Sequence, residues 1–307
     1  MRILFYAEGN PEPWLAGLQA LLPRARLRLW QPGDHEPADY AVVWRPPAEV
    51  LQGRSDLKAI FNLGAGVDAL LQLGEALPPV PIVRLDDAGM ALQMAEYVTY
   101  AVLRYFRRFD RFELQAQRGE WKFMKPYSHA DFTVGILGMG MLGQRIAQSL
   151  GHFGFPLVGW SRTAKDVPGV TCHAGADGLD ACLRASKVVV CVLPLTPATT
   201  GILNRRTLGK MAQGGFVINV ARGAHVVEAD LLELVQLGHI AGATLDVFAQ
   251  EPLPAGHPFW TEPNITITPH VAALTLREAS LRQIARKIHA LEQGEKIDGV
   301  VDRNRGY

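Results

Sequence analysis

The sequence predicts an α/β protein with two doubly wound, Rossmann-like domains, each built on a parallel sheet. Two observations lead to this fold class. Short apolar runs alternate with helical stretches over residues 1–90, and a second alternating series begins at Thr133. Repeated alternation of strands and helices gives a parallel sheet with helices on both faces. A chain of 307 residues is long enough for two such domains.

The first series is expected to contain four strands and two helices. The strands are expected at residues 3–6, 41–43, 59–62 and 82–84, and the helices at 15–22 and 67–73. A long helix should follow, because apolar residues recur every three to four positions: Met94, Val98, Val102, Tyr105, Phe109 and Phe112. Residues 110–131 are polar and irregular but contain Trp121 and Phe123, which predicts an exposed arm suited to a subunit contact.

The second series is expected to contain six strands. They should end at Leu137, Trp160, Val192, Val220, Leu245 and Thr268. A last helix is expected over residues 274–292, because apolar side chains share one helical face there: Leu281, Ile284, Ile288 and Leu291.

The composition restricts the partners and the compartment. A net charge of +1 gives no electrostatic reason to expect nucleic acid or an anionic membrane as a partner. Three cysteines without C-x-x-C spacing indicate neither a disulfide framework nor a metal site, and they suit a reducing compartment. No apolar run resembles a signal peptide or a membrane span. We therefore expect a cytoplasmic protein with no bound metal.

A glycine-rich turn near the middle of the chain indicates the binding of a dinucleotide. The segment Gly138-Met139-Gly140-Met141-Leu142-Gly143 reads G-x-G-x-x-G, between the apolar run 132–137 and a helical pattern. Strand, glycine turn and helix together bring backbone N–H groups close to a pyrophosphate. Gly138, Gly140, Met141, Leu142 and Gly143 are therefore predicted to bind the cofactor.

The next strand end suggests which nicotinamide cofactor is used. An NAD site usually has an acidic residue about 20 residues after the first glycines, for the ribose 2′-hydroxyl. Here the positions are Ser161, Arg162 and Thr163. Because a guanidinium suits a 2′-phosphate, we predict NADPH, with NADH as an alternative. A basic surface loop would give the same sequence.

The remaining strand ends carry further polar residues, and all should meet at one edge of the sheet. Leu193 and Pro194, Val220 and Ala221, and Asp246 are expected beside the cofactor. Arg222, Glu251 and His270 are predicted to be catalytic.

These three side chains together suit hydride transfer to a 2-keto acid. Arg222 suits a bidentate clamp on a carboxylate and polarises a neighbouring keto oxygen. A carboxylate such as Glu251, bonded to one nitrogen of His270, fixes the tautomer and favours the charged ring. The protonated ring then donates to a developing alkoxide.

These motifs resemble the D-2-hydroxyacid dehydrogenase family over nearly the whole chain. The likeness lies in residues 64–68 (GAGVD), 138–143, 193–197 (LPLTP), 219–223 (NVARG), 245–252 (LDVFAQEP) and 269–270 (PH). Within the family, residues 44–47, 107–110, 160–163 and 301–307 are most similar to a group of glyoxylate and hydroxypyruvate reductases.

The resemblance implies roles for the matching positions. Arg222 would hold the carboxylate and keto group, His270 would be the proton donor paired with Glu251, and Asp246 would contact the nicotinamide side of the cofactor. Five further residues would bind the substrate, the first three through their backbone: Ala65, Gly66, Val67, Trp44 and Arg45.

The resemblance also implies a domain organisation and an oligomer. The cofactor domain, residues 95–280, would be inserted into a substrate domain made of residues 1–94 and 281–307. A homodimer would form around the long helix and its arm, with Trp121 reaching toward the partner's active site.

Two other functions fit the same residues. A reductase of larger 2-keto acids stays open, because the size of the pocket is not readable from the sequence. A cofactor-sensing binding protein without catalysis would retain the same three side chains.

Overall fold

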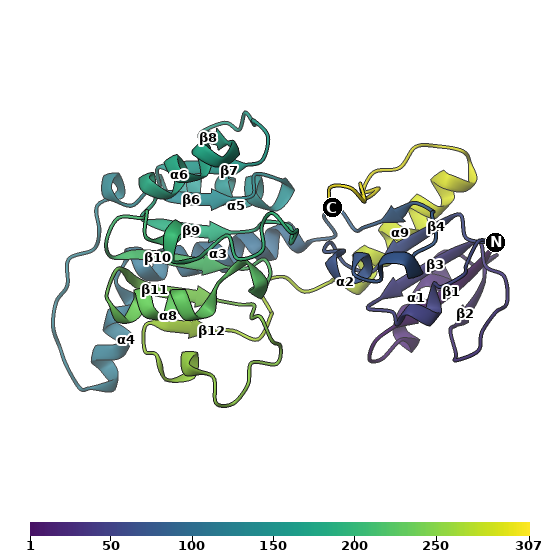
Figure 1. Ribbon diagram of the computed structural model, residues 1–307, viewed down its shortest axis with the longest axis horizontal. Helices are drawn as coiled ribbons and strands as arrows, with labels where there is room; N and C mark the ends of the chain where they lie inside the picture. The colour runs from purple at the N-terminus through teal and green to yellow at the C-terminus, as the bar shows by residue number, and fades with distance from the viewer. The chain divides into compact units, whose positions relative to one another are not determined.

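The computed structural model describes residues 1–307, and the chain folds into two compact units. Unit 1 contains residues 1–90 and 275–307, and unit 2 contains residues 91–274 (Figure 1). Each unit has its own parallel sheet, so the predicted fold class is confirmed. Unit 2 is inserted into unit 1, because the chain returns to unit 1 after residue 274.

Unit 1 is built on five parallel strands in the order β2-β1-β3-β4-β5. The strands are β1 (Arg2–Ala7), β2 (Arg26–Leu29), β3 (Tyr40–Trp44), β4 (Ala59–Asn62) and β5 (Ile82–Val83). The sequence did not predict β2. This strand lies at the sheet edge, and its alternation of arginine and leucine leaves no continuous apolar run.

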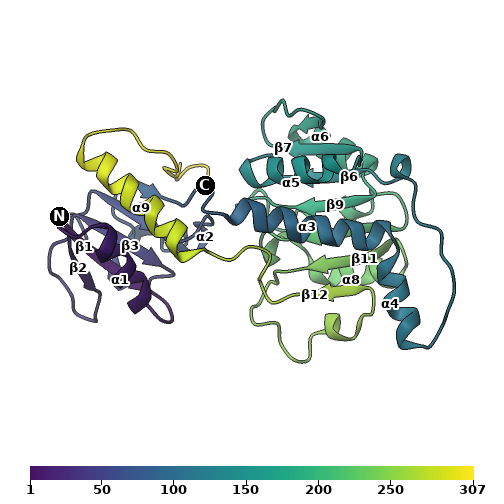
Figure 2. The ribbon, with the colours of Figure 1, turned by 180° about the vertical axis from the view of Figure 1, so that it is seen from behind.

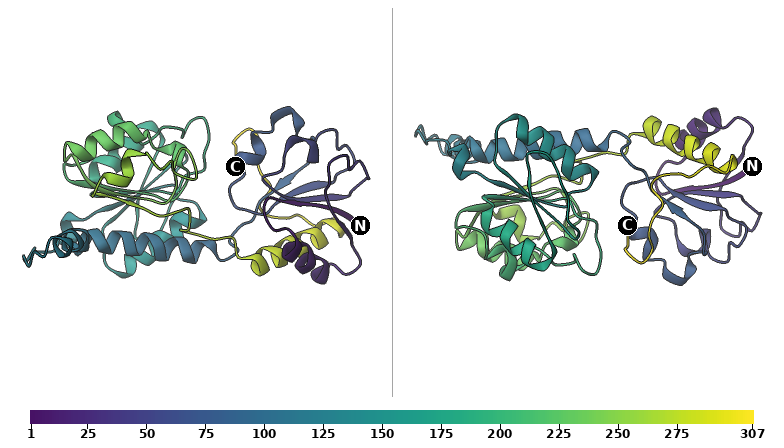
Figure 3. Two further views of the ribbon diagram at one scale, coloured as in Figure 1. Left: turned by 90° about the horizontal axis from the view of Figure 1, so that it is seen from below. Right: turned by 90° about the horizontal axis from the view of Figure 1, so that it is seen from above.

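The helices of unit 1 come from both ends of the chain. Helix α1 (Glu12–Leu21) lies beside α9 (Arg277–Glu292) on one face of the sheet (Figures 2 and 3). A Cβ on Gly17 would lie 2.6 Å from a methyl group of Leu281, so the two helices approach closely there. The short elements are η1 (Ala48–Val50), α2 (Asp68–Leu71) and η2 (Gly74–Ala76). Apolar residues of η1 and α2 pack against β1, β3 and β4.

A buried lysine fixes the returning helix α9 in unit 1. Lys287 is 3% exposed, and its Nζ donates to Asp86 Oδ2 at 2.6 Å and to the Arg84 carbonyl at 3.1 Å. The side chain of Gln283, one turn earlier, accepts from the Asp86 amide at 2.8 Å. The segment after β5 is thus bonded to residues from the other end of the chain.

Unit 2 contains seven parallel strands in the order β12-β11-β10-β9-β6-β7-β8. They are β6 (Val134–Leu137), β7 (Leu157–Ser161), β8 (Thr171–Ala174), β9 (Val188–Cys191), β10 (Gly215–Asn219), β11 (Ile240–Leu245) and β12 (Ile265–Ile267). The sequence predicted six of them. Strand β8 was missed because it is a partly exposed edge strand with a polar sequence.

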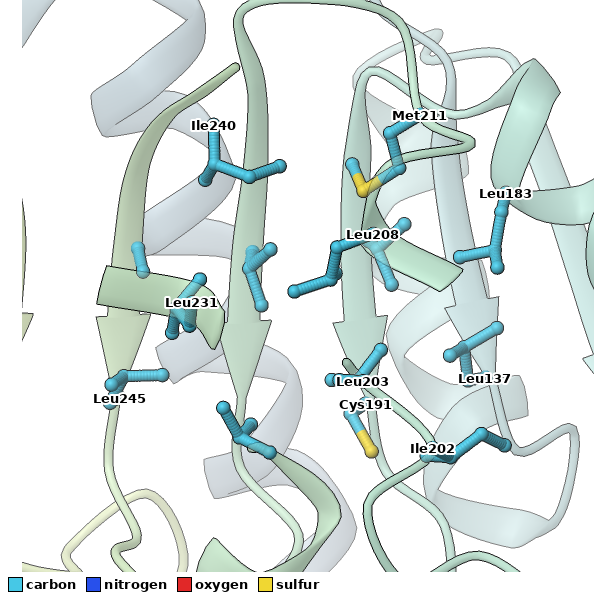
Figure 4. Close-up of a cluster of buried hydrophobic side chains, with 14 of the residues drawn as sticks. Leu137, Leu183, Cys191, Ile202, Leu203, Leu208, Met211, Leu231, Ile240 and Leu245 are labelled. Carbon is cyan, nitrogen blue, oxygen red and sulfur yellow. The ribbon is translucent and has the colours of Figure 1, made fainter. Parts of the chain in front are cut away.

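Helices cover both faces of this sheet, as the figures show from several sides (Figures 1 to 3). Helices α3 (Met90–Phe106) and α5 (Met141–His152) pack on one face. The other face carries α6 (Gly175–Ala185), α7 (Arg205–Leu208) and α8 (Glu228–Gln236). Figure 4 shows the apolar core beneath these three helices. Short 3-10 turns complete the unit: η3 (His129–Asp131), η4 (Gly223–His225) and η5 (Pro258–Thr261). None of the helices combines the length and hydrophobicity needed to span a bilayer.

The prediction of one long helix from Met94 to Phe112 is wrong in one respect, because the helix breaks before Phe109. Helix α3 ends at Phe106, and α4 (Phe109–Gln117) is a separate helix within the arm predicted to be irregular. Arg108, between them, has a left-handed backbone with φ of 66°. Its guanidinium lies 4.2 Å from the ring centre of Tyr127, a contact between distant residues that helical periodicity does not reveal.

We predict that Lys287→Met destabilises unit 1. The substitution keeps most of the unbranched side chain but leaves the Asp86 carboxylate without its closest cation. Because the pair is largely buried, we expect the free energy of unfolding to fall by about 2–3 kcal/mol, measured by chemical denaturation. The control is Lys296→Met, at an exposed position. Equal stability of the two variants would contradict the assignment.

Candidate active site

The strand order of unit 2 defines where a ligand binds. The order reverses between β6 and β9, and ligands bind beyond the carboxyl ends of the strands at such a point. The loops after these two strands approach closely, because a Cβ on Gly138 would lie 2.9 Å from the Val192 carbonyl oxygen. Leu193 and Pro194 follow in the second loop, and Leu193 is largely buried.

Each glycine of the turn has a distinct structural reason. Gly138 has a φ of +111°, which other residues rarely adopt. A Cβ on Gly143 would lie 1.9 Å from the Gly138 carbonyl oxygen, so only glycine lets α5 pack this closely. Gly140 faces open space, since an added Cβ would meet no atom within 4 Å. The N-terminus of α5, at Met141 and Leu142, lacks a side-chain cap, which leaves it suited to an anion.

The end of β7 presents a basic, exposed segment. Ser161 is half-buried, and its hydroxyl donates to the Thr163 carbonyl at 2.7 Å, which shapes the turn. Arg162 and Thr163 are exposed. No acidic residue follows β7 before Asp166, so the turn offers a guanidinium where a carboxylate is usual in NAD sites.

The loop after β10 holds Arg222 through buried polar side chains. Val220 and Ala221 are buried, and Arg222 is half-buried beyond them. The side chain of Asn219, which has no exposed surface, donates to the Arg222 carbonyl at 2.9 Å and accepts from the Ala221 amide at 3.2 Å.

A buried histidine bonds the same loop to its neighbour. The Nδ1 of His225 lies 3.2 Å from the Arg222 amide, and its Nε2 lies 3.3 Å from the Pro194 carbonyl. Nδ1 also lies 3.0 Å from the Arg222 carbonyl, so the imidazole bridges the backbone of Arg222 to the loop after β9. Gly223 is required beside it, because a Cβ there would lie 1.8 Å from the Phe248 backbone.

Asp246 follows β11 and accepts hydrogen bonds from the turn at residues 268–272. It is 1% exposed. One carboxylate oxygen accepts from the Thr268 hydroxyl at 2.6 Å and the Val271 amide at 2.8 Å, and the other accepts from the Ala272 amide at 2.9 Å. Its backbone carbonyl accepts from the His270 amide at 2.9 Å.

His270 and Glu251 form a hydrogen-bonded pair. Nδ1 of His270 lies 2.7 Å from Glu251 Oε2, and the other carboxylate oxygen accepts from the Phe248 amide at 3.0 Å. The imidazole is 39% exposed, so it is accessible to a small molecule. The carboxylate assigns the proton to Nδ1 and leaves Nε2 as the reactive nitrogen.

The predicted substrate residues of unit 1 lie together at the carboxyl ends of β3 and β4. Trp44 ends β3, and its ring packs against Gly64, where a Cβ would lie 2.3 Å from the ring. Arg45 is exposed, with a φ of 45°, and its guanidinium lies 5.6 Å from the Trp44 ring centre.

The turn after β4 is shaped by a buried amide. Asn62 donates to the carbonyls of Gly64 at 2.9 Å and Gly66 at 2.8 Å. Ala65 and Gly66 are half-buried, and the side chain of Val67 is buried, so the backbone of this turn is the part that remains for a ligand.

The structure thus brings the predicted residues of unit 2 to one sheet edge and those of unit 1 to another. Trp121 lies outside both groups, fully exposed in the arm after α4. The sequence predicted no individual role for four supporting residues: Asn219, Gly223, His225 and Thr268. Asn219 and Gly223 appeared only as part of the motif at residues 219–223, and the only signal for His225 and Thr268 was that they stand close to Arg222 and His270 in the chain.

Comparison with known proteins identifies the family. Residues 99–272 match the profile described as "D-isomer specific 2-hydroxyacid dehydrogenase, NAD binding domain". The chain is 52% identical to glyoxylate/hydroxypyruvate reductase A of Serratia proteamaculans and 49% identical to the protein of that name from Yersinia enterocolitica. Both alignments cover all of this chain and all of the relative.

Solved structures are also similar over the full chain. A D-isomer specific 2-hydroxyacid dehydrogenase from Xanthobacter autotrophicus, in complex with NADPH and MES, has a TM-score of 0.94 at 40% identity, covering 100% of this chain and 99% of that one. An NADPH-dependent glyoxylate/hydroxypyruvate reductase from Sinorhizobium meliloti, in complex with NADP and sulfate, has a TM-score of 0.92 at 38% identity, with the same coverage.

Two alanine substitutions in the glycine turn should have different effects, one on cofactor binding and one on stability. Gly140→Ala should leave folding unchanged but weaken NADPH binding at least tenfold, because its Cβ enters the open space that the pyrophosphate needs. Gly143→Ala should destabilise the fold itself, because its Cβ collides with backbone. Thermal unfolding without cofactor and NADPH titration by fluorescence separate the two effects. Unimpaired NADPH binding by Gly140→Ala would refute the assignment.

Proposed function

The chain belongs to the D-isomer specific 2-hydroxyacid dehydrogenase family, and we propose that it reduces glyoxylate and hydroxypyruvate with NADPH. The observation that carries this proposal is the His270–Glu251 pair, which lies on the same sheet edge as the glycine turn and Arg222. The relatives named above support the choice of small 2-keto acids, since they match over their full length.

The residues at the sheet edge fit NADPH. Gly140 and the uncapped N-terminus of α5 form a cradle for a pyrophosphate, and the exposed Arg162 suits a 2′-phosphate. The loops after the next two strands, β9 and β10, adjoin this cradle and contain Leu193, Pro194, Val220 and Ala221. When bound, NADPH supplies the hydride that reduces the keto carbon.

The protein's own side chains supply binding and the proton. The guanidinium of Arg222 binds the substrate carboxylate and polarises the keto oxygen. Protonated His270 donates its Nε2 proton to that oxygen as the hydride reaches the carbon, so the C=O group becomes CH–OH. Glu251 stabilises the charged ring before transfer and fixes the Nδ1–H tautomer afterwards. The proposed contact of Asp246 with the cofactor stays a prediction, as do the substrate-binding roles of the two turns in unit 1.

The exposed aromatic residues of unit 2 suit a homodimer. Four of them lie on α3, on α4 and on the arm that follows: Tyr100, Phe109, Trp121 and Phe123. Such a group of exposed aromatic side chains is typical of a subunit interface.

The cysteines suit a location in the cytoplasm. All three are free thiols, which is typical of a reducing compartment.

We predict that His270→Asn lowers kcat for glyoxylate reduction by about 10²–10⁴-fold, because the general acid is lost. Glu251→Gln should lower it less, since an amide still accepts a hydrogen bond from Nδ1 but no longer stabilises the charged ring. NADPH affinity should be unchanged in both variants, measured by fluorescence titration.

A matched control is His257→Asn, because His257 also pairs with a glutamate, Glu228, at 3.3 Å. This variant should retain the turnover of the unmodified enzyme. Near-normal turnover in His270→Asn would eliminate the proposed proton donor.

A further inference from the structure

We propose that Tyr97, on helix α3, is a positioning residue for His270 and acts through Thr268 and Asp246. The inference rests on the proposed function, because it assigns Tyr97 a part in aligning the proposed proton donor. All four residues belong to unit 2.

A chain of short hydrogen bonds connects α3 to the turn that carries His270. The Tyr97 hydroxyl lies 2.6 Å from Thr268 Oγ1, which lies 2.6 Å from Asp246 Oδ1. An ionised carboxylate only accepts, so the Thr268 hydroxyl donates to Asp246. Its oxygen then accepts from Tyr97. The donor order therefore runs from the helix to the buried aspartate.

The turn beyond Asp246 needs this support. His270 has a φ of 57°, a left-handed conformation that is strained for a residue with a side chain. The amides on both sides of this residue donate to Asp246: the His270 amide to its backbone carbonyl and the Val271 amide to its carboxylate. The position of the carboxylate therefore determines the position of the imidazole.

Tyr97 is a donor throughout the working pH range. Burial raises the pKa of its hydroxyl to about 12, and the nearby charge of Asp246 acts in the same direction. The phenol therefore stays protonated at neutral pH. Phenylalanine would keep the ring packing and remove only this donor.

The same helix provides a matched control. Tyr105, about two turns further along α3, bonds through its hydroxyl to Thr244 Oγ1 at 2.9 Å. That threonine lies within β11, two residues before Asp246, but its side chain makes no hydrogen bond to residues 268–272. Tyr105→Phe therefore removes the same kind of bond from the same helix without loosening the turn.

The experiment compares Tyr97→Phe with Tyr105→Phe in steady-state reduction of glyoxylate. We expect Tyr97→Phe to lower kcat about threefold to tenfold, the effect of losing one hydrogen bond, with NADPH affinity unchanged. The isotope effect on kcat, measured with NADPH deuterated at the transferred position, should rise, because a misaligned donor slows chemistry. A variant that is merely less well folded would lose kcat without changing the isotope effect.

A double variant tests the order of the chain. Thr268→Val removes both bonds, so Tyr97→Phe combined with Thr268→Val should be no slower than Thr268→Val alone. Additive losses would show that Tyr97 acts by another route and would overturn the proposal.

A second readout is independent of activity. Hydrogen exchange of the Val271 and Ala272 amides should be faster in Tyr97→Phe than in Tyr105→Phe, since both amides donate to Asp246. Equal exchange in the two variants would overturn the positioning role even if the enzyme is active. Faster exchange in a protein without turnover on any 2-keto acid would support the positioning role and reject the proposed function.

Discussion

The proposed active site depends on the hydrogen bonds that the buried carboxylate of Asp246 accepts. This carboxylate stands at the end of β11, has almost no exposed surface and accepts three hydrogen bonds from residues 268–272. A buried charge is tolerated only when donors of this kind surround it. Those donors give the chain a fixed turn after β12, and His270 is held on it in a strained conformation. With the imidazole held in this way, a single hydrogen bond from Nδ1 to Glu251 fixes the orientation of its ring.

The order of the strands explains why the other functional residues meet there. The helices on both faces force every strand of unit 2 to run in the same direction, so the chemistry-bearing loops share one edge. Three glycines permit the close approaches that this crowding demands, at Gly138, Gly143 and Gly223. The backbone therefore determines much of the site, and Arg222, Glu251 and His270 supply its reactive groups.

Much of this organisation could be predicted from the sequence, because buried parallel strands are continuous apolar runs and the functional residues follow them directly. The edge strands β2 and β8 were missed, since partial exposure leaves their sequences polar. The break between α3 and α4 was missed because the contact of Arg108 with Tyr127 forms only in the folded chain. The bond from Tyr97 to Thr268 joins residues 171 positions apart, so no local pattern encodes it.

The unmodified enzyme is best tested by the initial rate of 2-keto acid reduction, measured as kcat/KM for glyoxylate and for hydroxypyruvate, each with NADPH and with NADH. We expect turnover of both substrates and a preference for NADPH of at least tenfold, because Arg162 replaces the acidic residue usual in NAD sites. Absence of turnover with either cofactor would contradict the assignment of the sheet edge as a catalytic site.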